Sequence, residues 1–340
     1  MNMAVDKNDF KYILMKDAEW CNHLGFSDFE GLNNIIDRGK AVQLVNLCEA
    51  RHENRCNTIS YYIKERGNVK VILLAGPSSS GKTSTSLRIA LQCKVHGLNP
   101  RTIELDNYFL DREQTPKLPD GGYDYECLEA MDLKLLNHDL CALLSGEEVD
   151  IPTFDFKNGA KVWDGKHKMH LESNDILILE GIHALDPEMT RDIPEEAKFY
   201  IYVSDISSIS NYDPNIHTTD NRLLRRMVRD NRVRGISPEE TILRWPSVRQ
   251  GEEKWIFPFQ KNANMVFNST MQYELPLLKH FVTPLLRGIG EDSPAYAEAQ
   301  RLLSVLKNIE PLPLEAIQAI PCTSIMREFV GGQILSRELL

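Results

Sequence analysis

The feature that most constrains the fold of this 340-residue chain is the stretch Gly76-Pro77-Ser78-Ser79-Ser80-Gly81-Lys82-Thr83, which fits the pattern G-x-x-x-x-G-K-S/T. An apolar run, residues 71–75, precedes this stretch, and a segment with helical periodicity, 83–95, follows it. In such a strand–loop–helix unit, glycines let the backbone turn tightly, so that N–H groups and the positive end of the helix face phosphate groups. The stretch therefore predicts a phosphate-binding loop.

The polar side chains of this loop agree with nucleotide binding. Lys82 supplies a mobile positive charge for the β- and γ-phosphates, and Thr83 supplies a hydroxyl group for Mg²⁺. A Gly/Ser-rich turn without function is the competing interpretation, but the flanking strand and helix argue against it. We expect ATP and Mg²⁺ as cofactors, with ATP bound along nine consecutive residues: Gly76, Pro77, Ser78, Ser79, Ser80, Gly81, Lys82, Thr83 and Ser84.

Short apolar runs and helix-period segments alternate along most of the chain. The runs typical of strands are 69–75, 102–105, 176–179, 199–203 and 265–267, and the helical segments are 83–95, 128–144, 222–229, 238–249 and 271–286. Such alternation predicts parallel βαβ units. We therefore expect an α/β fold, namely a P-loop NTPase three-layer sandwich with a parallel central sheet.

The two ends of the chain have a different pattern. Residues 1–66 contain two or three amphipathic segments and end before the break Gly67-Asn68. This predicts a small, mostly helical N-terminal region beside a main domain over residues 67–340. Near the other end, Pro311-Leu312-Pro313 predicts a helix break that leads into a short tail.

Composition excludes several classes of protein. Asp and Glu number 49 against 39 Lys and Arg, a formal net charge of −10, which argues against general nucleic-acid binding. The apolar runs are far shorter than the ~20 residues that cross a bilayer, and Met1 to Lys11 lack the features of a signal peptide. The seven dispersed cysteines are typical of reduced, buried thiols. We expect a soluble cytoplasmic protein with no membrane partner.

Two acidic residues follow predicted strands. Glu180 ends the run 175–179, at the strand end where open α/β sheets bind ligands, so it is a candidate magnesium ligand opposite Thr83. Asp106 follows the run 102–105. If that strand lies beside the loop strand, Asp106 emerges at the same sheet edge as Lys82 and can accept a proton from an attacking hydroxyl there. The alternative for Glu180 is a solvated acid at a strand end, and the alternative for Asp106 is an ordinary turn aspartate.

A basic stripe lies on one predicted helix. Its members, at positions i, i+3, i+4 and i+7 of one face, are Arg222, Arg225, Arg226 and Arg229. Like charges at this spacing repel one another, so the stripe needs an anion. One interpretation is a mobile lid whose arginines, with Arg234 nearby, close on transferring phosphates. The other is a solvated face paired with nearby acids.

Six ordered motifs are similar to those of a known family. They are residues 76–83, Asp106-Asn107-Tyr108-Phe109, Tyr123-Asp124-Tyr125-Glu126, Ile151-Pro152-Thr153-Phe154-Asp155-Phe156, Glu180-Gly181-Ile182 and Arg225-Arg226-Met227-Val228-Arg229-Asp230. On these motifs the chain resembles the uridine kinase and phosphoribulokinase family of P-loop kinases, from about Lys70 to Gly332. The resemblance implies an ATP- and Mg²⁺-dependent kinase domain over residues 67–340.

The resemblance also implies roles for individual residues. Asp106 becomes the general base that activates a nucleoside 5′-hydroxyl, and Lys82 and Arg229 become the other catalytic residues. Glu126 becomes the acid that binds the ribose 2′- and 3′-hydroxyls, and Glu180 becomes the magnesium-side acid beside Thr83. The remaining implied contacts are Arg229 and Arg234 with the ATP phosphates, and Tyr108, Phe154, Phe156 and Arg226 with the acceptor.

Three positions depart from the pyrimidine nucleoside kinases of this family. Gly159 stands where those enzymes have a base-reading histidine, Ile236 stands in place of an arginine, and Phe154 lacks the phenol hydroxyl of some members. A site without these polar groups lacks the partners that repay desolvation of a base's polar edge. We therefore expect weak discrimination among bases.

Two further stretches, 245–253 and 256–258, resemble a uridine-kinase-like subgroup. In that subgroup a region similar to parts of threonyl-tRNA synthetase often precedes the kinase, and residues 49–53 resemble the end of that region.

Three functions remain open at this point. The leading one is phosphorylation of a small-molecule acceptor, a nucleoside or related ribose compound. A second is phosphorylation of a pentose phosphate, although Glu126 and the aromatic residues near Asp155 favour a neutral nucleoside. A third is a non-catalytic nucleotide-binding regulatory or RNA-associated protein, against which the acidic charge and the presence of Asp106 and Lys82 weigh. The sequence leaves open whether the chain forms a homo-oligomer.

Overall fold

The computed structural model describes residues 10–118, 121–207 and 217–336. At its centre five strands form one sheet: β1 (Val71–Ala75), β2 (Asn99–Glu104), β7 (Asp175–Glu180), β8 (Lys198–Ser204) and β9 (Met265–Asn268). Their order is β2-β7-β1-β8-β9, and every neighbouring pair is parallel. The five predicted strands and the parallel central sheet are therefore confirmed.

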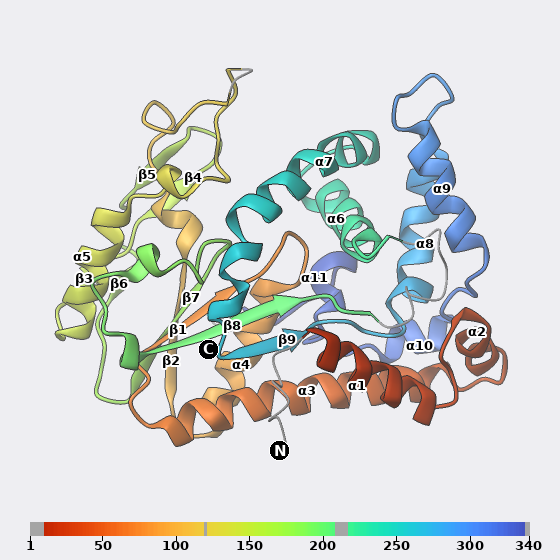
Figure 1. Cartoon of the computed structure of the whole chain (residues 1–340), viewed down its shortest axis with the longest axis horizontal. Coiled ribbons are helices and arrows are strands. Elements are labelled where there is room, and N and C mark those ends of the chain that lie inside the picture. The colour runs from red at the N-terminus through yellow and green to blue at the C-terminus, as the bar shows by residue number, and fades with distance from the viewer. Residues whose placement is uncertain (1–9, 119–120, 208–216, 337–340) are drawn as a thin grey trace, which may run out of the picture.

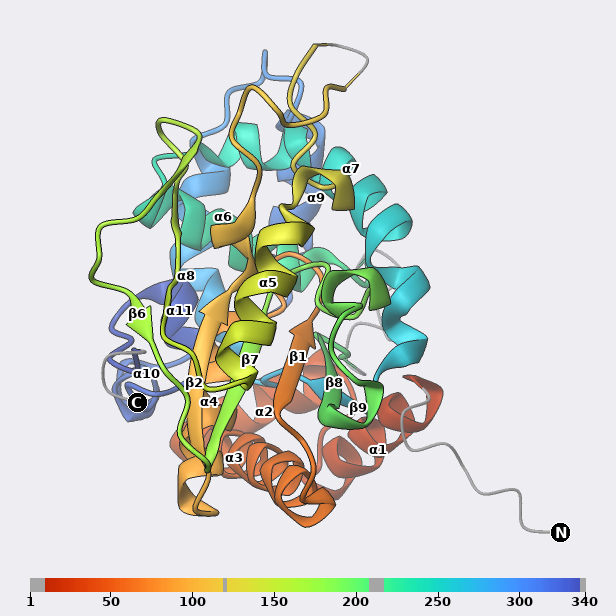
Figure 2. The ribbon, with the colours of Figure 1, turned by 90° about the vertical axis from the view of Figure 1, so that its left-hand side faces the viewer.

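Helices cover both faces of this sheet and complete the predicted three-layer sandwich (Figure 1). On one face lie α3 (Ala41–Arg66) and α4 (Lys82–Val95), which share a buried core with the sheet around Ile59. On the other face α5 (Leu133–Leu144) buries Leu140 in a second core. Figure 2 shows the strands with their carboxyl ends directed toward the helices above the sheet.

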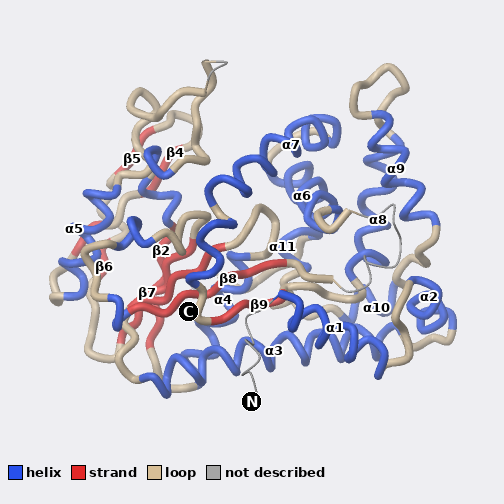
Figure 3. Tube along the Cα trace, in the orientation of Figure 1, coloured by secondary structure: helices blue, strands red, loops and turns tan. Residues whose placement is uncertain are grey.

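A group of helices extends the molecule beyond the sheet on the side of β9 (Figure 3). Their bounds are α6 (Asp220–Val233), α7 (Pro238–Trp255), α8 (Glu274–Arg287), α9 (Tyr296–Lys307), α10 (Leu314–Ala319) and α11 (Met326–Val330). They share the largest core of the described chain, to which Leu223, Leu277, Leu302 and Phe329 belong. This core holds α6 and α7 above the carboxyl ends of the strands.

The N-terminal region is helical, as predicted. Helices α1 (Phe10–His23) and α2 (Phe29–Asp37) precede α3, and Asp28 caps α2 by accepting a hydrogen bond from the Gly31 N–H. The long helix α3 joins two cores, because Val45 packs among the C-terminal helices and Ile63 packs against the sheet. The division of the chain into two domains at residue 67 stays a prediction.

Two short antiparallel strand pairs, an outer pair and a hairpin nested within it, follow α5 in the chain and were not predicted from the sequence. One pairs β3 (Val149–Asp150) with β6 (Lys168–Met169), and the other pairs β4 (Thr153–Asp155) with β5 (Ala160–Val162). The nested hairpin holds the aromatic residues Phe154 and Phe156 near the carboxyl end of β2.

Several predicted boundaries were wrong. The helix predicted from residue 128 begins at Leu133, because the Asp132 side chain accepts a hydrogen bond from the Leu135 N–H and caps it there. The predicted C-terminal tail is not a loose end, since α10 and α11 follow Pro313 and bury Ile325 and Phe329.

Five cysteines are buried as predicted, whereas Cys141 and Cys322 are exposed, and the structure records all seven as free thiols. Within the described ranges, no helix combines the length and apolar character that crossing a membrane requires.

Candidate active site

The carboxyl ends of β1, β2 and β7 open into a cleft of about 420 Å³ that α6 and α7 close from above. Ligand sites form at this edge of an open α/β sheet because the strands end together there. The cleft brings together most of the charged residues that the sequence singled out. Its charged lining is Lys82, Glu104, Asp106, Glu126, Glu180, Arg226, Arg229, Arg234, Glu252 and Glu328.

The phosphate-binding loop has glycines where its backbone is most restricted. A Cβ atom at Gly76 would collide with the main-chain oxygen of Val203, and one at Gly81 would collide with the Ile325 side chain. Gly81 also has a φ of 83°, in the left-handed region that favours glycine. Because Gly81 is the N-cap of α4, the loop delivers the start of that helix to the cleft.

The nine predicted ATP-binding residues divide into two groups. Those that line the cleft are Ser78, Ser79, Gly81, Lys82 and Thr83. Gly76, Pro77, Ser80 and Ser84 are buried at or behind the loop. The cleft-lining members face the space in which phosphates would lie, and the buried Ser84 donates from its main-chain N–H to Glu328, which also lines the cleft.

Lys82, Thr83 and Glu180 lie together in the cleft. The Lys82 Nζ donates a hydrogen bond to the Pro77 carbonyl over 3.3 Å, and the Thr83 Oγ1 donates one to Glu180 Oε2 over 3.2 Å. Hydroxyl and carboxylate oxygens are ligands that Mg²⁺ prefers. This donor set fits the predicted ion: Thr83 and Glu180 would hold it, and it would neutralise charge on the nucleotide phosphates.

Asp106 lies in the short 3₁₀ helix η1 (Leu105–Tyr108), directly after β2, and lines the same cleft as Lys82. The hypothesis that β2 neighbours the loop strand β1 was wrong, because β7 lies between them. Asp106 nevertheless reaches the cleft, since parallel strands end at the same edge of a sheet. A carboxylate here can accept a proton from a hydroxyl group in the cleft.

Glu126 lies against α7, where a Cβ atom at Gly251 would be 3.3 Å from the Glu126 Cγ. Burial raises the pKa of the Glu126 carboxyl, and the positive charges of Arg226 and Lys82 oppose this rise. An ionised carboxylate in this position can accept hydrogen bonds from two neighbouring hydroxyl groups.

Three aromatic rings line the cleft: Phe109, Tyr125 and Phe156. The rings of Phe109 and Tyr125 meet edge to face with their centroids 5.5 Å apart, and Phe156 meets Phe109 in the same way at 6.3 Å. Phe156 is 62% exposed, so its ring is accessible from solvent. Together the three rings offer a surface on which a planar ligand can stack.

Two predicted acceptor contacts do not reach the cleft. Tyr108 is fully buried, and its hydroxyl donates a hydrogen bond to Asp139 Oδ2 over 3.0 Å. Phe154 is also buried, with its ring 5.1 Å from that of Phe156. Both residues pack beneath the cleft. In the motif that contains Tyr108, the next residue, Phe109, faces the cleft instead.

Arg222 and Arg225 correct the hypothesis of a single ligand-facing stripe. Arg222 is buried and donates to both carboxylate oxygens of Glu252, over 2.6 and 3.0 Å, and to the Ser78 carbonyl. Arg225 is fully buried, and its Nε donates to Glu274 Oε2 over 2.8 Å. These two arginines anchor α6, so the anion that they need comes from the protein itself.

The other three arginines line the cleft and share one acid. Asp230, which is fully buried, lies within ion-pair distance of Arg226 (3.3 Å), Arg229 (2.8 Å) and Arg234 (3.4 Å). A second acid, Glu328, lies 3.9 Å from Arg229, so the protein itself partly neutralises this group of arginines. The Arg226 Nη1 also donates to the Ser78 Oγ over 2.8 Å, which joins the arginine cluster to the phosphate-binding loop.

Two acids that contact the loop escaped the sequence analysis. Glu252 accepts a hydrogen bond from the Ser78 N–H over 3.0 Å, and Glu328 accepts one from the Ser84 Oγ over 2.6 Å. Glu252 lies in the stretch 245–253, whose resemblance to a kinase subgroup was its only signal. Glu328 had no signal, because nothing in the local sequence of α11 points to the loop.

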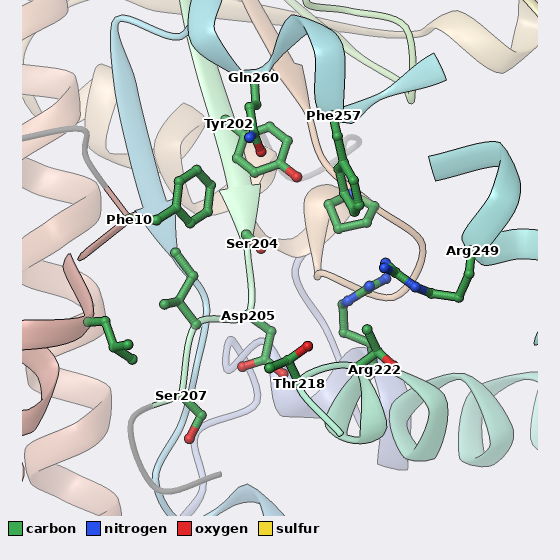
Figure 4. A pocket seen from close by; sticks show the side chains of 14 residues that line it. Phe10, Tyr202, Ser204, Asp205, Ser207, Thr218, Arg222, Arg249, Phe257 and Gln260 are labelled. Carbon is green, nitrogen blue, oxygen red and sulfur yellow. The ribbon is translucent and has the colours of Figure 1, made fainter. Parts of the chain in front are cut away.

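A second cavity, of about 370 Å³, lies on the other side of the loop (Figure 4). Among the described residues that line it, Pro77 is the one member of the phosphate-binding loop. Phe10 of α1 meets Tyr202 there with ring centroids 5.8 Å apart, and the side chains of Arg222 and Arg249 approach each other from α6 and α7 (Figure 4). Both arginines donate to Glu252, which lies outside this lining. The N-terminal region therefore reaches the back of the loop.

Three known proteins illustrate what this chain is similar to. Uridine kinase of Staphylococcus epidermidis is 28% identical over 197 residues, which cover 58% of this chain and 86% of that protein. Uridine kinase of Halobacterium salinarum is 29% identical over 194 residues, covering 57% and 77%. A solved structure described as a possible uridine kinase from Bacillus stearothermophilus is 19% identical, with a TM-score of 0.41, and covers 65% of this chain and 100% of that one.

The model of the Phosphoribulokinase / Uridine kinase family matches residues 71–275, which span the sheet, the phosphate-binding loop and helices α4 to α7. The extension of the resemblance to Gly332 stays a prediction. Since the match covers more than half of the chain, the chain belongs to the phosphoribulokinase / uridine kinase family of kinases.

Proposed function

We propose that this protein transfers the γ-phosphoryl group of ATP, with Mg²⁺, to the 5′-hydroxyl of a ribonucleoside. One observation carries the proposal: a single cleft contains the phosphate-binding Lys82, the carboxylate of Asp106, and Glu126 with three aromatic rings nearby. A nucleoside kinase needs a phosphate site, a proton acceptor and a ribose site within reach of one another.

The nucleotide end of the cleft would bind and stabilise phosphates. Lys82 would neutralise the β- and γ-phosphates, and Thr83 and Glu180 would hold Mg²⁺ beside them. Arg229 and Arg234 line this end of the cleft, where they share Asp230 with a third arginine. They would stabilise the charge that spreads over the transferring phosphoryl group.

The acceptor end would hold a ribose and a base. Glu126 would accept hydrogen bonds from the 2′- and 3′-hydroxyls, which directs the 5′-hydroxyl away from it and toward the phosphates. Asp106 would take the proton of that hydroxyl as it attacks. The rings of Phe109, Tyr125 and Phe156 would stack on the base.

Gly159 stands at the position where a base-reading histidine was expected, and the side chain of Arg112 packs against it. Gly159 has a φ of 69°, and the Arg112 side chain lies so close that a Cβ atom at Gly159 would be 2.6 Å from the Arg112 Nε. The Arg112 Nη2 donates to the carbonyls of Phe156 and Lys157, over 3.1 Å each. This arrangement supports weak selection among bases, because stacking distinguishes bases less than hydrogen bonds do.

A pentose phosphate is the second candidate acceptor. Arg226 supports it, since this guanidinium lines the cleft with Glu126 and would pair with a phosphate on the acceptor. A neutral nucleoside fits better, because the three aromatic rings have no role with a sugar phosphate. The third possibility is a nucleotide-binding protein without catalysis.

One assay separates these functions. Formation of ADP from ATP and Mg²⁺ is followed with ribonucleosides, 2′-deoxyribonucleosides and pentose phosphates as acceptors. We expect turnover with ribonucleosides, at catalytic efficiencies within about two orders of magnitude across the four bases. Turnover with pentose phosphates alone would transfer the proposal to the second candidate, and nucleotide binding without acceptor-dependent turnover would leave the third.

A further inference from the structure

Helix α11 contacts the first turn of α4, directly after the phosphate-binding loop, through the carboxylate of Glu328. Glu328 Oε2 accepts hydrogen bonds from the Ser84 Oγ over 2.6 Å and from the Ser84 main-chain N–H over 3.4 Å. Ser84 follows Lys82 and Thr83 in the first turn of α4 and is fully buried. Its N–H is therefore among the first donors of a helix, which have no partner within the helix and carry partial positive charge.

A nucleotide phosphate requires the same donors. In a loop of this pattern, main-chain N–H groups of the loop and of the following helix hold the nucleotide phosphates. One N–H group cannot serve a carboxylate and a phosphate together, and two anions in contact repel each other. Glu328 therefore lies where a bound nucleotide would place negative charge.

A lid arginine faces the same carboxylate. The Arg229 Nη1 is 3.9 Å from Glu328 Oε1, in addition to the contact of Arg229 with Asp230. Glu328 thus faces two groups that the proposed function assigns to ATP, the start of α4 and an arginine of α6. A phosphate that entered the cleft would find both of these groups already in contact with Glu328.

The segment around Glu328 is joined to α4 and to α6. The Gln333 Nε2 donates to the Ser84 Oγ over 2.9 Å, and the Arg232 guanidinium donates to the carbonyls of Glu328 and Phe329 over 2.9 and 3.2 Å. Movement of Glu328 away from Ser84 would therefore change how α11 contacts both helices.

We propose that Glu328 is an internal competitor of the nucleotide: its carboxylate occupies a phosphate position on Ser84 and leaves when ATP or ADP binds. This rests on the proposed function, since it assumes that the cleft binds nucleotides. The competition lowers the apparent nucleotide affinity by the fraction of molecules in which the position is open. It also couples nucleotide binding to loss of the contact between α11 and the start of α4.

Calorimetric titration of the full chain with ADP tests this proposal. Glu328→Ala removes the competing carboxylate, so we expect it to bind ADP about tenfold more tightly than the unchanged protein. Glu328→Gln keeps the shape but removes the charge, and its affinity should lie between the two. Glu315→Ala is the matched control, because it removes an exposed acid from the neighbouring helix α10 and should leave the affinity unchanged.

Inorganic tripolyphosphate serves as a second probe, because it offers phosphates without a base or ribose. We expect Glu328→Ala to improve its binding by the same factor as that of ADP. Equal or weaker binding of ADP by Glu328→Ala would overturn the proposal, and so would a gain for ADP without one for tripolyphosphate. If Glu328→Ala does not fold, as judged by thermal unfolding, Glu328→Gln carries the same comparison.

The proposed function can fail separately. If the unchanged protein binds ADP but phosphorylates no acceptor, catalysis is excluded while the competition is still measured. If neither the unchanged protein nor Glu328→Ala binds ADP, ATP or tripolyphosphate, nucleotide binding itself is excluded, and the role of Glu328 is excluded with it.

Discussion

The Thr83 hydroxyl donates a hydrogen bond to the Glu180 carboxylate over 3.2 Å, which joins the start of α4 to the end of β7. The two residues are 97 positions apart in the chain. They meet because β7 pairs directly with β1, the strand that precedes the phosphate-binding loop. The contact brings a hydroxyl and a carboxylate oxygen together beside Lys82, and the proposed magnesium–nucleotide complex would require both as ligands.

Replacement of Lys82 should abolish most turnover. Lys82→Ala removes the point charge from the β- and γ-phosphates, so kcat should fall by about 10²–10³, as when one charge-stabilising group is lost. Steady-state kinetics at saturating ATP and ribonucleoside measure this. Lys94→Ala, at the exposed far end of the same helix, is the control and should retain full activity. Near-normal turnover by Lys82→Ala would refute the assignment of the loop.

Asp106→Asn should separate nucleotide binding from catalysis. Asparagine keeps the shape of the side chain but cannot accept the proton, so kcat should fall by roughly 10²–10⁴ while the affinity for ATP is retained. Nucleotide titrations and kinetics on the same preparation test both halves, with the exposed Glu113→Gln as a nearby control. A collapse of ATP affinity would instead identify Asp106 as a metal ligand or structural residue.

Glu126 should give ribose recognition a pH dependence. Burial raises the pKa of its carboxyl, so the carboxylate is lost on acidification at a higher pH than for an ordinary glutamate. As pH falls through this pKa, kcat/KM for a ribonucleoside should fall toward that for its 2′-deoxy form. The ratio of the two isolates Glu126, because Asp106 acts on both acceptors alike.

Two variants check this assignment. Glu126→Gln should lower the ratio about 10-fold or more at neutral pH, and remove its pH dependence, since a charged hydrogen-bond acceptor is lost. Glu129→Gln, an exposed acid in the same segment, should change neither. Equal use of ribo- and deoxyribonucleosides by the unchanged protein would exclude Glu126 from ribose binding.

The buried ion pair of α6 and α8 should matter for stability. Arg225→Ala leaves Glu274 buried without its main partner, so the free energy of unfolding should fall by about 3–5 kcal/mol. Arg244→Ala, which breaks an exposed pair with Glu240 on α7, should cost less than about 1 kcal/mol. Urea unfolding measures the free energy of unfolding of both variants. Similar decreases in the two variants would show that Arg225 does not anchor α6.

Local sequence patterns were sufficient to predict the strands of the sheet and the phosphate-binding loop. Apolar runs such as 176–179 predict strands, and the glycines and Lys82 predict the loop, because each pattern reports on its own segment. Glu180 and Asp106 could be assigned to one edge because parallel strands end together. The order of the strands could not be predicted, since pairing of β2 with β7 depends on contacts between distant segments.

The remaining errors also arise from distant contacts. Helical periodicity placed Arg222 and Arg225 on the same face as Arg226 and Arg229, but it could not show that Glu252 and Glu274 lie against the first two. Glu328 reaches Ser84 across 244 positions, a distance at which a local pattern has no information. Tyr108 was expected to contact the acceptor, but in the 3₁₀ helix η1 its side chain is buried, and Phe109 lines the cleft.

The most direct test of the central claim is the phosphorus NMR spectrum of a reaction that contains the full chain, ATP, Mg²⁺ and one ribonucleoside. We expect equal amounts of ADP and of the ribonucleoside 5′-monophosphate, with neither formed when the ribonucleoside is omitted. Formation of ADP and free phosphate at the same rate without an acceptor, or no ribonucleoside monophosphate under any of the four bases, would contradict this claim.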